Sequence, residues 1–263
     1  MSQRIRPLGS FFPQDEHGYV CNPCAAESLA GPWEPVLAEV AAVYQQHLGE
    51  RLHSVWLRGS LPRGLMVADI SDVDTFALVS GRAFFHWRRP TWAPDEAARL
   101  RRRFPLAGEV EFMLSSYHEE LERHNPRLAM LIATQSLPLV GPDIRPILPR
   151  FRPGPDMLLH YRWLAADLEV FAGRPTYRRQ DCRQLAKQLL RVAGELVQER
   201  DGRFTPDLYW CYVAFIRYYP ERAAAFREVF HFFLNPVAGD PATRSKLLKQ
   251  GHWLLPEVRL HLP

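Results

Sequence analysis

The chain has 263 residues, of which 47% are hydrophobic and 24% are charged, and its net charge is +4. These values are typical of a globular protein, and no apolar run reaches the roughly 18 residues that a membrane span requires. We therefore expect a cytoplasmic protein without a membrane segment. Its four cysteines are expected to be reduced thiols, because the pair Cys21 and Cys24 lacks the second pair that a structural zinc site needs.

The first half of the chain mixes strand and helix patterns. Short apolar runs typical of buried strands occur at 53–57, 74–79 and 109–114. Apolar residues recur at helical spacing, or lie between helix start and stop signals, at 33–47, 94–103 and 117–132. This pattern predicts an α+β fold, with a small mixed sheet flanked by helices.

The second half of the chain is predicted to be helical. Six prolines between residues 138 and 155 indicate a linker. Helical patterns follow at 156–171, 180–200, 207–218, 221–234 and 242–252. We therefore predict two domains, with the mixed sheet in residues 1–150 and an all-α domain in residues 151–263.

Acidic residues stand at the start of two of the predicted strands. Asp72 and Asp74 share one face by strand alternation, and Glu109 and Glu111 do the same. If these strands are neighbours, three or four carboxylates converge on one patch. Two unit charges about 4 Å apart repel by roughly 4 kcal/mol at an effective dielectric near 20. Either the carboxylates take up protons or a cation binds there, and Mg²⁺ is the natural cation because it suits one or two carboxylates together with water and phosphate oxygens.

A Gly-Ser turn precedes the acidic residues. Gly59 allows close approach of the backbone to a phosphate, and the Ser60 hydroxyl can donate to its oxygens. Arg63 can add charge-assisted hydrogen bonds, although Pro62 removes one N–H from such a loop. Carboxylates that bind a metal, facing a turn that binds phosphate, are typical of phosphoryl or nucleotidyl transfer.

The order of these features resembles the signature of the DNA polymerase β-like nucleotidyltransferase superfamily. That signature is an apolar strand, a Gly-Ser turn, an Asp-x-Asp motif and a third carboxylate on a later strand. Here it corresponds to Gly59-Ser60, Asp72-Val73-Asp74 and Glu111, within residues 53–115. The length and the two-domain layout are similar to those of antibiotic nucleotidyltransferases, notably the aminoglycoside adenylyltransferases.

The resemblance implies a role for each motif residue. Asp72 and Asp74 would hold Mg²⁺, Gly59 and Ser60 would contact the triphosphate, and Glu111 would act as general base or as a third metal ligand. The sheet domain would be catalytic, and the helical domain would bind the acceptor or the nucleotide. The implied reaction moves a nucleoside monophosphate, AMP from ATP, to the hydroxyl of an acceptor, with an aminoglycoside-like small molecule as the first expectation.

A basic stripe is predicted in the helical half. Arg183, Lys187 and Arg191 recur every four residues, which places them along one side of a helix. Like charges at this spacing oppose each other, so Lys187 and Arg191 are candidates for binding the phosphates of the nucleotide. The alternative is a solvated face on which Glu195 compensates Arg191.

Two other functions stay open from the sequence. The first is the same chemistry on a macromolecule, either a protein side chain or the 3′ end of an RNA. The arginines near 99–103 would then line a nucleic-acid path, and RNA binding would depend steeply on salt concentration. A non-catalytic module that binds a nucleotide or a partner is the second, and the trio Asp72, Asp74 and Glu111 argues against it.

Overall fold

The chain forms two compact units in the computed structural model, which describes residues 5–66, 71–81, 85–119 and 121–261. The sheet unit comprises residues 21–151, and the helical unit comprises residues 152–263 together with residues 1–20. Each unit has its own hydrophobic core. The predicted α+β fold, a mixed sheet flanked by helices and followed by a helical part, is confirmed.

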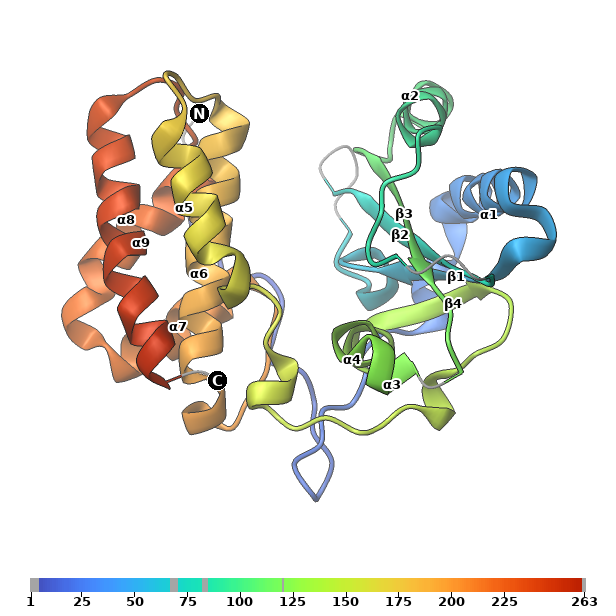
Figure 1. Cartoon of the computed structure of the whole chain (residues 1–263), viewed down its shortest axis with the longest axis horizontal. Coiled ribbons are helices and arrows are strands. Elements are labelled where there is room, and N and C mark those ends of the chain that lie inside the picture. Colours follow the sequence, from blue (N-terminus) through green and yellow to red (C-terminus); the bar gives the residue numbers. More distant parts are fainter. Residues whose placement is uncertain (1–4, 67–70, 82–84, 120, 262–263) are drawn as a thin grey trace. The chain divides into compact units, whose positions relative to one another are not determined.

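The sheet unit contains a four-stranded sheet in the order β3-β2-β1-β4. The strands are β1 (Leu52–Arg58), β2 (Val73–Val79), β3 (Val110–Ser116) and β4 (Ser136–Val140). β1 runs antiparallel to both β2 and β4, whereas β2 and β3 are parallel. The accompanying helices are α1 (Glu34–Leu48), α2 (Ala93–Arg103), α3 (Leu121–His124) and α4 (Pro126–Gln135) (Figure 1).

One face of the sheet packs into the core formed with α1 and α2. Val73 and Ala77 of β2 and Phe112 of β3 belong to this core, together with apolar residues of both helices. Successive side chains on a strand point to opposite faces. Asp74 and Glu111 therefore lie on the other face of the sheet.

The predicted linker contains part of a strand. Leu137 of β4 is the register partner of Leu57 on β1, and Pro138 is the partner of Trp56. A proline cannot donate to a strand ladder, but β4 is an edge strand, where a missing N–H is tolerated. Because frequent prolines indicate a linker, the composition of this segment does not predict the fourth strand.

Five α-helices lie within the described part of the helical unit (Figure 1). They are α5 (Leu164–Gly173), α6 (Arg179–Asp201), α7 (Leu208–Tyr218), α8 (Ala223–Leu234) and α9 (Pro241–His261). Across the described residues, no helix combines the length and the apolar character needed to cross a bilayer.

Two helix boundaries differ from prediction. α5 begins at Leu164 rather than at residue 156, because the chain before it turns to bind Glu195. The Glu195 carboxylate accepts hydrogen bonds from three consecutive backbone N–H groups, those of residues 159–161. α9 continues through Pro256, well past the predicted end at residue 252.

The N-terminal segment packs on the helical unit, which departs from the predicted domain of residues 1–150. Phe12 is 4% exposed, its ring meets that of Phe204 edge to face at 5.3 Å, and its N–H donates to the Phe204 carbonyl. Trp210 donates its indole N–H to the carbonyl of Gly9. These contacts join parts of the chain almost 200 residues apart, so no local pattern could indicate them.

We predict that Phe12→Ala destabilises the helical unit by about 3 kcal/mol, because it removes a buried aromatic ring and leaves a cavity. Leu8→Ala is the matched control, since Leu8 is 68% exposed and should change stability by less than about 0.5 kcal/mol. Calorimetric unfolding measures both variants. Equal stability of the two would contradict the packing of the N-terminal segment.

A second prediction concerns Asp181 in the first turn of α6. Its carboxylate bonds with the Arg178 side chain and backbone N–H, and it pairs with Arg174, which lowers its pKa from 3.8 to about 2. The charged form is therefore stabilising above pH 3.8, and this contribution is lost as the pH falls toward 2. Asp181→Asn should cost about 1 kcal/mol at pH 7. Urea titrations at several pH values should show that the difference in unfolding free energy between Asp181→Asn and wild type decreases at acidic pH. A difference that does not change with pH would contradict the prediction.

Candidate active site

Three charged side chains lie in a row across the sheet. Arg58 at the end of β1 is the register partner of Asp74 on β2, and Asp74 is the partner of Glu111 on β3. Arg58 Nη2 is 2.5 Å from Glu111 Oε2 and 3.7 Å from Asp74 Oδ1. The two strands therefore bring Asp74 and Glu111 together, with an arginine between them.

Arg58 is the residue that prediction from the sequence missed. Burial lowers the pKa of its guanidinium, but the charges of Asp74 and Glu111 outweigh burial and raise the pKa above its ordinary value. The arginine is thus a permanent cation. The acidic pair was expected to need a cation from outside the chain, but the chain supplies one.

Asp72 and Glu109 lie just before the strands. Asp72 Oδ1 accepts a hydrogen bond from the Glu109 N–H at 3.1 Å, and the Glu109 carboxylate lies 3.8 Å from Arg89 Nη2. Among the described residues, no three or more His, Cys, Asp or Glu side chains are arranged to hold a metal ion. The expected convergence of three or four carboxylates is therefore replaced by the pair Asp74 and Glu111.

The Gly-Ser turn lies directly against Asp74. Gly59 has a φ of +86°, which strains any other residue, and a Cβ atom at this position would force the Asp74 carboxylate to move. The Ser60 hydroxyl points to the sulfur of Met66 at 3.7 Å. Arg63 Nε donates to the Gly59 carbonyl at 3.0 Å.

The connection that follows begins with a 3₁₀ turn at Leu61–Arg63. Pro62 is buried at the start of this turn, where its missing N–H costs little. Residues 67–70, which belong to the segment between the Gly-Ser turn and the Asp-x-Asp motif, lie outside the described residues.

The donor set of this site suits Mg²⁺. This ion takes one or two carboxylates from a protein and completes its shell with water and substrate phosphates. Asp74 is partly exposed, with 29% of its side chain accessible, and Asp72, two residues earlier in the chain, is exposed. Because Gly59 has no Cβ atom, Asp74 Oδ2 lies directly against the backbone of the turn.

Lys187 and Arg191 lie on α6 of the helical unit. Arg191 Nη1 is 3.2 Å from His160 Nε2, and burial lowers the pKa of His160 although Glu195 opposes the shift. Glu195 is buried and bonds with His160 Nδ1 at 2.8 Å. It is therefore an anchor for the chain before α5, and the interpretation of Glu195 as a solvated partner of Arg191 is wrong.

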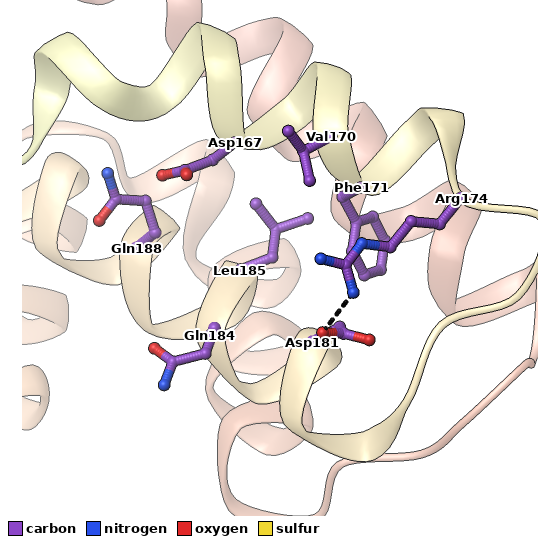
Figure 2. Close-up of a pocket in the computed structure, with 8 residues that line it drawn as sticks. All are labelled: Asp167, Val170, Phe171, Arg174, Asp181, Gln184, Leu185 and Gln188. Atoms are coloured by element: carbon purple, nitrogen blue, oxygen red, sulfur yellow. Dashed lines mark ion pairs between the residues drawn. The ribbon is translucent and has the colours of Figure 1, made fainter. Parts of the chain in front are cut away.

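The helical unit also contains a pocket of about 200 Å³ between α5 and α6 (Figure 2). Burial raises the pKa of Asp167 on its α5 side, and Arg174 pairs with Asp181 at 2.7 Å. The residues that line it are Asp167, Val170, Phe171, Arg174, Asp181, Gln184, Leu185 and Gln188. Carboxylate and carboxamide oxygens around an apolar base suit a ligand with amine and hydroxyl groups. No pattern in the sequence indicates this pocket.

The chain is similar to spectinomycin adenyltransferase AAD(9) from Enterococcus faecialis, whose crystal structure contains ATP and spectinomycin. The two are 13% identical with a TM-score of 0.49, and the alignment covers 86% of this chain and 99% of the other. Neither protein-family models nor curated proteins give a match to this sequence.

We predict that Gly59→Ala destabilises the sheet unit more than Gly64→Ala. Both residues have positive φ, so an added methyl group strains both. At Gly59 it would also collide with Asp74, whereas at Gly64 the nearest atom is the movable Ser28 hydroxyl at 3.3 Å. Thermal unfolding of the two variants should differ by about 1 kcal/mol or more, and an equal effect would show that Asp74 does not crowd the turn.

Proposed function

We propose that this protein is a Mg²⁺-dependent nucleotidyltransferase that moves AMP from ATP to the hydroxyl of an acceptor and releases pyrophosphate. One observation carries the proposal: Asp74 lies against Gly59 of the Gly-Ser turn and beside Glu111 on the next strand. A phosphate bound at the turn would therefore lie close to a carboxylate that can bind a metal.

Asp72 and Asp74 would hold Mg²⁺ in this function. When bound, the ion neutralises charge on the triphosphate and on the departing pyrophosphate. Asp72 already accepts one backbone N–H, but a carboxylate has about four acceptor positions, so it can also bind a metal. Glu111, the predicted general base or third ligand, is paired with Arg58 through Oε2, and either role is favoured when the arginine moves away.

The phosphate contacts follow from the turn. The Ser60 hydroxyl now donates to a thioether sulfur, a weak acceptor that a phosphate oxygen would readily replace. Arg63 uses one of the five guanidinium N–H groups on the Gly59 carbonyl, which is compatible with a further bond to phosphate. Lys187 and Arg191 are the proposed phosphate contacts from the helical unit.

A small molecule that carries hydroxyl and amine groups, such as an aminoglycoside, is the proposed acceptor. Support comes from the pocket between α5 and α6, whose Asp167, Gln184 and Gln188 offer oxygens to ammonium and hydroxyl donors. A volume of about 200 Å³ suits one ring-sized group of such a molecule.

Incubation with labelled ATP, GTP, CTP or UTP, Mg²⁺ and a panel of acceptors tests the proposal. The panel contains aminoglycosides, other polyhydroxylated amines and an RNA. We expect label transfer from ATP to a small acceptor, with a loss of at least about a hundredfold in Asp74→Asn because a charge that binds the metal is removed.

Asp95→Asn is the control for this experiment. Asp95 is an exposed aspartate in the first turn of α2, so the substitution changes net charge equally without touching the site. Transfer that is the same in wild type and Asp74→Asn would exclude the proposed site. Transfer only to the RNA would keep the chemistry and exclude the small acceptor.

A further inference from the structure

Arg58 occupies the place where a metal ion would neutralise the acidic pair. It makes a short contact with Glu111 and a longer one, 3.7 Å, with Asp74. Its Nε atom is buried and has no hydrogen-bond partner among the described residues. A buried donor without a partner is destabilising, so the guanidinium is only partly satisfied where it lies.

Trp87 gives Arg58 a second attachment. The guanidinium carbon lies 5.1 Å from the centroid of the Trp87 ring, which is a cation–π contact, and the same ring lies 5.3 Å from that of Phe76. Within the described ranges, Trp87 is the one non-glycine residue with positive φ, at +44°. Such a conformation is strained and persists only where surrounding contacts impose it. Trp87 can therefore hold the arginine even when the carboxylates do not.

Whether Arg58 moves away from the two carboxylates depends on the charge of the ligand that binds. A divalent ion that arrives alone is repelled by the guanidinium beside both carboxylates, and if the ion takes its place the arginine loses its anionic partners. A triphosphate that arrives with the metal supplies new anionic oxygens, which bind guanidinium groups strongly. Displacement is thus unfavourable for the metal alone and favourable for the metal together with nucleotide.

We propose that Arg58 is an internal counter-ion that occupies Asp74 and Glu111 until a triphosphate arrives, so that the divalent ion binds with the nucleotide rather than before it. This inference rests on the proposed function for the identity of the anion. It makes Arg58 a positioning residue, which acts through the two carboxylates.

Titration of the full chain with Mn²⁺ alone, followed by the electron paramagnetic resonance signal of the free ion, tests the inference. Arg58→Gln leaves the carboxylate pair without its cation, so we expect it to bind Mn²⁺ at least tenfold more tightly than wild type. Arg58→Lys keeps the charge and should behave like wild type. A merely structural role of Arg58 would not produce a gain in metal binding.

Two further variants complete the experiment. Arg51→Gln removes the same charge from an exposed residue just before the other end of β1 and should leave Mn²⁺ binding unchanged. Adding Asp74→Asn to Arg58→Gln should abolish the gained binding. If Arg58→Gln unfolds, Mn²⁺ should restore its thermal transition. Failure of Mn²⁺ to bind more tightly or to restore folding overturns the inference.

Binding of Mg²⁺ with a non-hydrolysable ATP analogue to wild type is measured separately. Its absence would exclude the proposed function but not the counter-ion role, which the titrations with Mn²⁺ alone decide. Binding of the analogue without a gain in Arg58→Gln would keep the function and exclude the counter-ion.

Discussion

The ionic contact of Arg58 with Asp74 and Glu111 is the interaction on which the candidate site depends. Like charges placed opposite each other on neighbouring strands destabilise a sheet, and partial burial increases their repulsion. The arginine from β1 offsets this repulsion because the β1–β2 register places it opposite Asp74. The sheet can therefore keep two adjacent carboxylates on the face opposite the α1 and α2 core.

Strand periodicity predicts much of this site. Alternation alone assigns Asp74 and Glu111 to the face opposite Val73 and Phe112, which the structure places in the core. It does not give the register between strands, because one sequence holds no record of which residues are paired. Arg58 was missed for this reason, since an arginine at the end of an apolar run also suits a solvated strand end.

The parts of the fold that escaped prediction are those set by distant contacts. Phe12 is held by Phe204, and β4 is held by pairing with β1. The segments that contain Phe12 and β4 show only irregular composition or frequent prolines. These features indicate that periodic structure is absent, but they do not indicate where a segment will pack. The same limit applies to Glu195, whose partners lie in the chain before α5 rather than on its own helix.

The ion pairs that stabilise the sheet also oppose metal binding in the proposed chemistry. This opposition affects the three acidic residues differently. Asp72 accepts a backbone N–H and can bind a metal without giving up that bond. Asp74 and Glu111 each contact the Arg58 guanidinium, whose positive charge opposes a cation beside them. Hydrogen bonds to charged groups contribute about 1.5–3 kcal/mol each, and a triphosphate can form several with one guanidinium and the turn. The nucleotide is thus the species able to resolve the conflict, which couples assembly of the site to arrival of its substrate.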